Sequence, residues 1–334
     1  MDIRFAFLVA AAWLAAVSGV GAAQEEVAGD DEAAADEVIA AGGETARPAD
    51  GRNDAEPRVV TFGVGAGFEY DSNVAVLELD ASAGAGDAAA LLELGAAYDR
   101  PADARLDFGA GYNFSETAHE DFSEFDVRIH RGSARMSYDF GRLDVGAMLQ
   151  HAYAELDGDE FLTLTQLSPY LSHLIGQRLF LRFAYADTDK EFAGNPGRDA
   201  AATSWSSDAY VFVNGLHTYL VFGHRYEDED ARDAEFDYLG HRLNMQLAQR
   251  FGLRAREITL RSYLRLESRD YRAVTPSIGE LRRDDRRELE AVAEIPIGRR
   301  LLARVGVKRA DNESNLASVD FSETVLSVGF NGTL

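Results

Sequence analysis

The sequence contains no cysteine. This absence excludes a disulfide framework, and it also excludes a lipid anchor attached through an N-terminal cysteine. Basic residues are scarce as well, with 33 lysines and arginines against 57 aspartates and glutamates and a formal net charge of −24. Phosphate binding needs clustered basic side chains, so this balance speaks against nucleic acid as a partner.

Long apolar runs are almost absent. The one clear case is 5–20, which follows the cation of Arg4 and precedes small residues that fit a small-x-small cleavage pattern. This arrangement predicts a secretory signal peptide over 1–23, cut after Ala23. An uncleaved anchor is the alternative, but the run is short for a bilayer span of about 20 residues. Since no other run suits a transmembrane helix, soluble export, periplasmic residence or insertion as a β-barrel remain open.

Local motifs for chemistry are also missing. The chain has no phosphate-cradling glycine loop, no zinc-ligand spacing and no GxSxG element, and none of its seven histidines stands in a local catalytic motif. We therefore expect no enzyme, no cofactor and no metal site. A serine–histidine pair assembled across strands stays open as the alternative.

Residues 24–57 form a low-complexity segment rich in Ala, Gly, Asp and Glu, with no aromatic side chain. Such a composition cannot bury enough apolar surface to offset the entropy of ordering. The segment is predicted to be a disordered acidic tether in the periplasm. A helix over its Ala/Glu part is the alternative.

From Arg58 onward, apolar and polar residues alternate with the period of a β-strand. The first strand sets Val60, Phe62, Val64, Ala66, Phe68 and Tyr70 against Thr61, Gly63, Gly65, Gly67 and Glu69. Two more strands with the same alternation follow, over 90–99 and 105–114. Eleven further segments bring the predicted number to fourteen: 124–139, 142–154, 161–175, 178–186, 205–214, 216–226, 236–249, 254–267, 287–297, 300–310 and 321–334. A loss of phase at 131–133 predicts a bulge, and Pro169 makes the 161–175 strand the weakest of the set.

The connections alternate between short and long along the whole chain. Tight turns such as Asn214-Gly215 separate longer, charged segments at 71–88, 115–123, 155–160, 187–204, 227–235, 268–286 and 311–320. Outer-membrane barrels have short periplasmic turns and longer outer loops, whereas a soluble sandwich has no reason to segregate them. In a soluble all-β protein the apolar face of each strand would face a core and the polar face would face water. Here the polar face is rich in Gly, Arg, Glu and Asn, and no second apolar sheet is available to cover the other face. The sequence thus predicts an all-β fold, a transmembrane antiparallel up-and-down barrel over 58–334. Tyrosines at both edges of the apolar faces fit membrane girdles: Tyr70, Tyr98, Tyr112, Tyr138, Tyr153, Tyr185 and Tyr226.

The inward face of the last third carries charges in an ordered series. Strands of opposite sign lie next to one another: Arg261 and Arg265, then Glu288, Glu290 and Glu294, then Arg300, Arg304 and Lys308. Adjacent strands of opposite sign can pair across the ladder. Such a lumen charge ladder either stiffens the wall by mutual neutralisation or forms a charge-selective pore lining.

Two of the predicted outer loops are strongly charged. The 227–235 loop holds Glu227, Asp228, Glu229, Asp230, Asp233 and Glu235. We expect a solvated, self-repelling loop here, with binding of divalent cations as the alternative. The 268–286 loop is rich in arginine, which fits either phosphorylated lipid headgroups or a complement to the acidic loops.

Two short motifs resemble the C-terminal barrel of the surface lipoprotein assembly modifier family. They are Phe68-Glu69-Tyr70-Asp71-Ser72-Asn73-Val74 at the end of the first strand and Asn312-Glu313-Ser314-Asn315 in the last hairpin. The resemblance implies fourteen strands over 58–334 and a role in moving a protein across the outer membrane. Members of that family usually carry helical repeats before the barrel, where this chain has its acidic tether.

The expected location is therefore the cell outer membrane of a Gram-negative bacterium. The expected function is a narrow channel or a secretion-type translocon, and the alternative is a structural or surface-interaction barrel that works through its acidic loops. Expected partners are outer-membrane lipid, the barrel-assembly machinery, and an exported protein or small solute as cargo.

Overall fold

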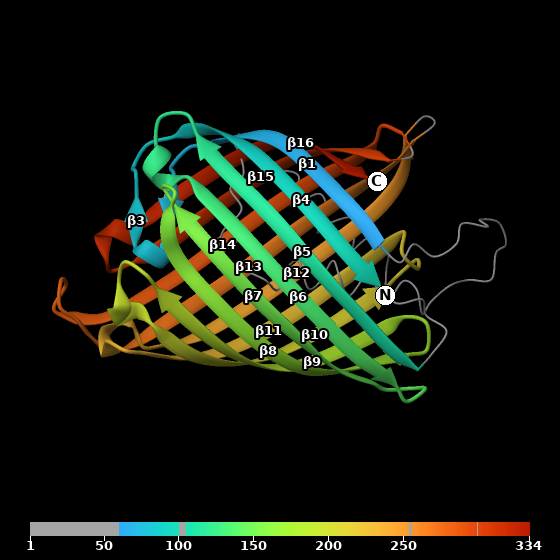
Figure 1. Ribbon diagram of the computed structural model, residues 1–334, viewed down its shortest axis with the longest axis horizontal. Coiled ribbons are helices and arrows are strands. Elements are labelled where there is room, and N and C mark those ends of the chain that lie inside the picture. The colour runs from blue at the N-terminus through green and yellow to red at the C-terminus, as the bar shows by residue number, and fades with distance from the viewer. Residues whose placement is uncertain (1–59, 100–104, 254–255, 299) are drawn as a thin grey trace, which may run out of the picture.

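The computed structural model describes residues 60–99, 105–253, 256–298 and 300–334. These residues form one closed barrel of fourteen antiparallel strands, as the alternation predicts (Figure 1). The order of the strands around the barrel follows their order in the chain, and β1 pairs with β16 to close it. The strands are β1 (Val60–Asp71), β4 (Asp87–Asp99), β5 (Leu106–His119), β6 (Val127–Asp139), β7 (Asp144–Leu156), β8 (Asp159–Ile175), β9 (Leu179–Phe192), β10 (Ala200–Phe212), β11 (Thr218–Ala231), β12 (Tyr238–Leu253), β13 (Arg256–Thr275), β14 (Glu280–Pro296), β15 (Leu301–Ser314) and β16 (Phe321–Thr333).

The apolar side chains of the strands point outward. Phe62, Phe68 and Trp205 are 52%, 71% and 62% exposed, and exposed large apolar residues occur all around the barrel. Most inward positions of the same strands carry glycine, alanine or polar side chains. A soluble barrel would bury the apolar set, so this surface is suited to the hydrocarbon of a membrane. The predicted girdle positions Tyr70, Tyr98, Tyr112 and Tyr138 are among the exposed aromatics.

The two ends of the barrel differ. One end, here called the turn end, holds the tight connections and the C-terminus (Figure 1). The other, here called the loop end, holds five short 3-10 turns: η1 (Leu77–Leu79), η2 (Ser123–Phe125), η3 (Pro196–Arg198), η4 (Ala234–Phe236) and η5 (Ala317–Val319). It also holds a small hairpin of β2 (Ala75–Val76) and β3 (Ala81–Ser82).

Several predicted outer loops are shorter than expected. The 155–160 loop is the two-residue turn Asp157-Gly158, where both residues have positive φ (53° and 80°), and the 268–286 loop shrinks to 276–279 because β13 and β14 run through most of it. Pairing between strands provides hydrogen-bond partners for the backbone N–H and C=O groups of these polar stretches. The barrel wall therefore extends at the loop end well beyond its apolar part.

The structure also bears on the bulge predicted at 131–133 and on the effect of Pro169 on its strand. The pairing of β6 with both neighbours is continuous through 131–133, so the bulge expected there is wrong. Register shifts occur instead at Ala154/Glu155 and between Asp270 and Val274. Pro169 lies within β8, where it pairs with Ala147 of β7.

The signal peptide predicted over 1–23 and the tether predicted over 24–57 lie outside the described residues. In the described part of the chain, no helix has the length and apolar character needed to cross a membrane.

Candidate functional site in the barrel lumen

One side of the lumen is lined by small residues. Its inward positions on β1, β4 and β5 include Gly63, Gly65, Gly67, Gly95, Ala97, Gly109 and Gly111. We call this surface the small wall. Side chains from neighbouring positions lie flat over two of these glycines: a Cβ at Gly65 would stand 2.8 Å from a Glu93 carboxylate oxygen, and one at Gly109 would stand 2.9 Å from Nε of Arg135. Around Gly95, by contrast, the nearest atom is 3.9 Å away.

The opposite side carries paired charges, on the inward faces of β11 to β16. We call this surface the charged wall. Five of its ion pairs join different strands: Arg242–Glu267 at 2.9 Å, Arg261–Glu294 at 3.2 Å, Arg265–Glu288 at 3.7 Å, Arg286–Glu323 at 3.1 Å and Lys308–Glu323 at 3.6 Å. Three more join residues two apart on one strand: Arg225–Glu227 at 2.9 Å, Arg269–Glu267 at 2.7 Å and Arg286–Glu288 at 3.2 Å. Most of these side chains are strongly buried. Each carboxylate that bridges two cations offsets part of its own desolvation by doing so.

The structure places most of the predicted ladder on this wall. Arg261 pairs with Glu294 and Arg265 with Glu288, while Arg304 lies opposite Glu294 in the register. Glu290 lies opposite Tyr263 and Lys308, not opposite Arg265 or Arg304. Arg300 is the exception to the predicted ladder. It is exposed in the turn that precedes β15, because that strand begins only at Leu301.

The predicted acidic loop is largely strand. Glu227, Asp228, Glu229 and Asp230 belong to β11, and only Asp233 and Glu235 lie in the following turn. Glu227 and Glu229 point into the lumen, where Glu229 lies 2.6 Å from Lys190 and both accept hydrogen bonds from the Tyr238 hydroxyl. Asp228 pairs with Arg272 on the outside. The expectation of a solvated, self-repelling loop is therefore wrong for Glu227, Asp228 and Glu229, which are strand residues paired with Arg225, Arg272 and Lys190, respectively.

Metal binding was the alternative for this acidic stretch. Across the ranges that the structure describes, no three His, Asp or Glu side chains come together in a group that could hold a metal ion.

The connection between β1 and β4, residues 72–86, crosses the loop end of the lumen. We call it the mouth segment. Its tip carries Asp80, which pairs with Arg198 of η3 and lies 2.7 Å from Arg282 of β14. Arg198 also donates a hydrogen bond to the carbonyl of Glu78 at 2.7 Å. These partners belong to separate parts of the rim, so the segment is fastened across the opening by side chains.

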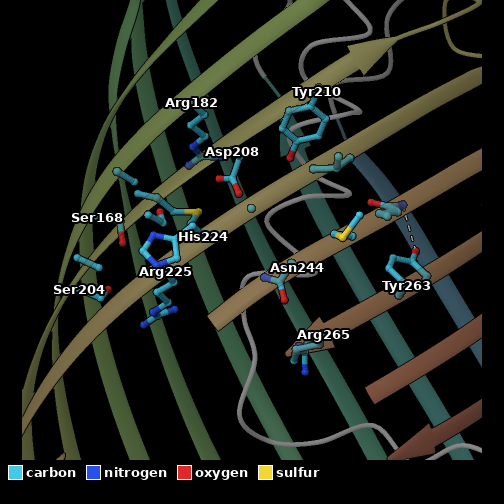
Figure 2. A pocket seen from close by; sticks show the side chains of 18 of the residues that line it. Ser168, Arg182, Ser204, Asp208, Tyr210, His224, Arg225, Asn244, Tyr263 and Arg265 are labelled. Atoms are coloured by element: carbon cyan, nitrogen blue, oxygen red, sulfur yellow. Dashed lines mark hydrogen bonds between the residues drawn. The ribbon is translucent and has the colours of Figure 1, made fainter. Parts of the chain in front are cut away.

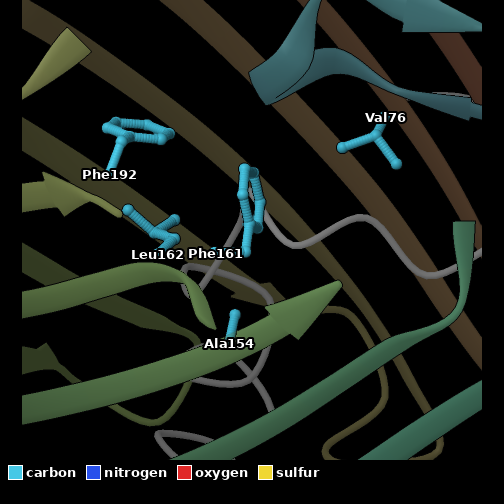
Figure 3. Close-up of a cluster of buried hydrophobic side chains, with 5 residues drawn as sticks. All are labelled: Val76, Ala154, Phe161, Leu162 and Phe192. Atoms are coloured by element: carbon cyan, nitrogen blue, oxygen red, sulfur yellow. The ribbon is translucent and has the colours of Figure 1, made fainter. Parts of the chain in front are cut away.

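An apolar contact holds the same segment from a third side. Val76 packs in a buried cluster with Ala154, Phe161, Leu162 and Phe192 from β7, β8 and β9. Figure 3 shows Phe161 between Val76 and Phe192. The cluster fixes the β2 part of the mouth segment against the barrel wall.

Two adjoining cavities lie along the β7–β14 side of the lumen. The first, of about 110 Å³, is at mid-barrel and is lined by charged and neutral polar groups including Arg182, Asp208 and Arg265 (Figure 2). The second, also of about 110 Å³, lies next to the mouth segment and is lined by Glu78 and Asp80 among others. Gln166 and Arg225 line both, so the two cavities lie next to one another along the wall. Each holds several water molecules by volume.

At the turn end, aromatic side chains fill part of the lumen on the same side. Tyr210, Tyr219, Val221 and Ala248 form a buried cluster, and Phe180 and Phe212 pack against it. The hydroxyl of Tyr219 accepts a hydrogen bond of 2.9 Å from Arg261. This cluster narrows the lumen below the mid-barrel cavity.

Sequence reasoning missed the mouth segment and the mid-barrel cavity. The Asp71-Ser72-Asn73 motif did contain a signal, because its side chains order the start of the mouth segment: Asp71 accepts a hydrogen bond from the Asn73 N–H at 2.9 Å, and Asn73 accepts one from Ser82. In the second motif, Ser314 donates to Asp284 at 2.6 Å. Both motifs thus fasten structure at the loop end.

No protein-family model matches the chain, and no curated protein sequence matches it. Among solved structures, the barrel is similar to an anion-selective porin from Comamonas acidovorans, with a TM-score of 0.50, 11% identity, and coverage of 82% of this chain and 99% of the porin. It is also similar to a bacterial polysaccharide outer membrane secretin (TM-score 0.46, 11% identity, 83% and 98% covered). A further similar structure is CdiB from Acinetobacter baumannii (TM-score 0.45, 9% identity, 83% and 60% covered).

At these identities the likeness concerns the fold. Closed antiparallel barrels with an apolar outer surface and a polar lumen span outer membranes. The described chain has both surfaces, and its fold is that of such barrels. It is an outer-membrane β-barrel.

Proposed function

We propose that the protein is a narrow channel for small hydrophilic solutes, with the loop end facing outward and the turn end facing the periplasm. The observation that carries this proposal is the pair of adjoining cavities lined by polar and charged groups beneath the mouth segment. A barrel with a purely structural role gains nothing from polar cavities in its lumen, because filling them with apolar side chains would stabilise it. The fold of the Comamonas anion-selective porin supports a channel in general terms.

The mouth segment acts in this proposal as a constriction. Its tip is held by the Asp80 pairs with Arg198 and Arg282 and by backbone hydrogen bonds within the segment, such as Val74 N–H to the carbonyl of Ala85 at 3.1 Å. No β-ladder of the described residues joins it to the barrel wall. Side-chain contacts of this kind break at lower cost than strand pairing, so the constriction is the part of the lumen most easily widened.

The experiment is single-channel recording in planar bilayers with the wild type and Asp80→Ala. Wild-type protein should show discrete conductance steps, and Asp80→Ala should show larger steps or more frequent opening, since both arginines lose their shared partner. Asp228→Ala, which breaks an ion pair on the outer face, is the matched control and should leave the conductance unchanged. A silent wild type whose Asp80→Ala variant is also silent would contradict the channel.

A second candidate rests on the resemblance of the two loop-end motifs to the surface lipoprotein assembly modifier family. Under it the barrel moves a protein to the cell surface and is closed at rest. Deleting the gene should then deplete a specific protein from the surface while purified barrels stay silent in bilayers. If neither conductance nor the surface proteome responds, the structural or surface-interaction barrel is what remains.

A further inference from the structure

We propose that Arg182, in the mid-barrel cavity, is a binding subsite for small carboxylate-bearing solutes. This inference rests on the proposed channel function and names the class of solute that the lumen retains. It begins from one difference among the arginines of the lumen. Those of the charged wall lie within ion-pair distance of carboxylates, whereas Arg182 lies over an aromatic ring.

Arg182 is deeply placed and lines the cavity. It is 9% exposed, and its guanidinium carbon lies 4.2 Å from the centre of the Tyr170 ring on β8. Within the described ranges, the structure gives it no hydrogen bond or ion pair. A tyrosine face stabilises a cation and leaves all five N–H donors unused. A desolvated guanidinium with unused donors on the wall of a cavity that holds several water molecules is a site for an anion.

The nearest carboxylate in the register does not occupy these donors. Asp208 lies directly across from Arg182 on β10. Its carboxylate leans toward the other neighbouring strand, where Oδ1 lies 2.7 Å from the position that a Cβ would take at Gly223 of β11. Arg182 leans over Tyr170 on β8, on the opposite side. The absent side chain of Gly223 therefore leaves room for Asp208 to turn away from the arginine.

The rest of the lining suits a carboxylate solute with polar substituents. Neutral hydrogen-bonding side chains from four strands face the cavity: Gln150, Gln166, Ser168, Ser204, Ser206 and Asn244. The planar fork of a guanidinium matches the two oxygens of a carboxylate. Tyr170 holds the plane of the fork, and the amides and hydroxyls offer both donors and acceptors to the remainder of the solute. Figure 2 shows Arg182 and Asp208 on one side of the cavity and Tyr263 and Arg265 on the other.

The test is block of the potassium chloride current by added sodium acetate and sodium benzoate in planar bilayers. The chloride current tests the channel by itself, so silence of both the wild type and Asp80→Ala refutes the proposed function and not the subsite. With a conducting wild type, Arg182→Gln should raise the half-blocking concentration of both carboxylates about tenfold, the effect of losing a charge-assisted hydrogen bond. Arg182→Lys should raise it less, because the charge stays and the fork is lost. Arg128→Gln, on the outer face, is the matched control.

Asp208→Asn gives a second readout that does not depend on the arginine variants folding. Removing this carboxylate should lower the half-blocking concentration, since an anion in the cavity no longer meets a negative neighbour. Inorganic phosphate is the comparison probe and should block less well than the carboxylates. Unchanged carboxylate block in Arg182→Gln, or in Asp208→Asn, would overturn the subsite, as would preferential block by phosphate.

Discussion

The two walls of the lumen use charge in different ways. On the small wall, the charged groups lie flat: Glu93 accepts a hydrogen bond from Asn331 across Gly65, and Arg135 pairs with Asp99 over Gly109. On the charged wall, the side chains share partners within and across strands, as Glu267 does with Arg269 on its own strand and Arg242 on the next. The small wall therefore leaves open space in the lumen, and the charged wall makes the barrel rigid. Glycine keeps the first free of side-chain volume, and mutual neutralisation allows the second to be desolvated.

The largest expected effect is on the charged wall. Glu267→Ala leaves Arg242 and Arg269 without their shared carboxylate, and breaking such buried pairs costs about 3–5 kcal/mol. The matched change on the small wall, Glu93→Ala, removes one hydrogen bond and should cost only about 1 kcal/mol. The measurement is the temperature at which the folded, fast-migrating form disappears in detergent gels of heated samples. Equal losses in the two variants would show that the walls do not differ in rigidity.

The next effect concerns room on the small wall. Gly95→Leu places a side chain where the nearest atoms are 3.9 Å away, so it enters the lumen without a clash. Single-channel conductance should fall by about half, while stability should change by less than about 1 kcal/mol, since glycine is itself unfavourable in a strand. Ala66→Leu, which points outward from β1, is the control and should leave the conductance as it was. An unchanged conductance in Gly95→Leu would place the solute path away from the small wall.

The smallest expected effect tests the role of Gly223 on the charged wall. Gly223→Ala brings a methyl group against the Asp208 carboxylate, which must rotate away. Rotation toward β9 would bring it to Arg182, and pairing there should weaken carboxylate block about twofold to threefold with little change in stability. The double variant Gly223→Ala with Asp208→Asn should restore the block. If the double variant stays weakened, Asp208 is not the group that moved.

The strand alternation was enough to predict the barrel, and the parity of the ladder was enough to predict which charges face inward. Both depend only on the two-residue period of a strand. The ends of the strands at the loop end were not predictable in the same way. Residues 187–192, 227–231 and 268–275 carry polar side chains on both faces, because they rise above the apolar surface, and such stretches read as loops.

The sequence predicts which side of a strand each charged residue occupies better than it predicts which residue lies opposite it on the next strand. The sequence places Glu290 on a strand between two basic strands but does not give the register, which sets Glu290 opposite Tyr263 and Lys308. A pairing partner depends on how far each strand is shifted against its neighbour, and the turns that set this shift have variable lengths. Arg182 was missed for a related reason. Its significance lies in Tyr170, Asp208 and Gly223, which come from three other strands and carry no local signal.

The pairing of β1 with β16 has a consequence for the order of folding. Every other ladder of the barrel joins strands that follow one another around the barrel and in the chain, and the longest connection between them, 72–86, is far shorter than the separation of β1 from β16. The last ladder joins residues more than 240 positions apart: the Thr324 N–H donates to Ser72 Oγ at 2.8 Å, and the Leu334 N–H donates to the Phe62 carbonyl at 2.9 Å. Contacts this distant form late, because the chain between them must be ordered first. Until that moment both β1 and β16 expose unpaired edges, and the protein is most open to pairing with another chain at this single junction.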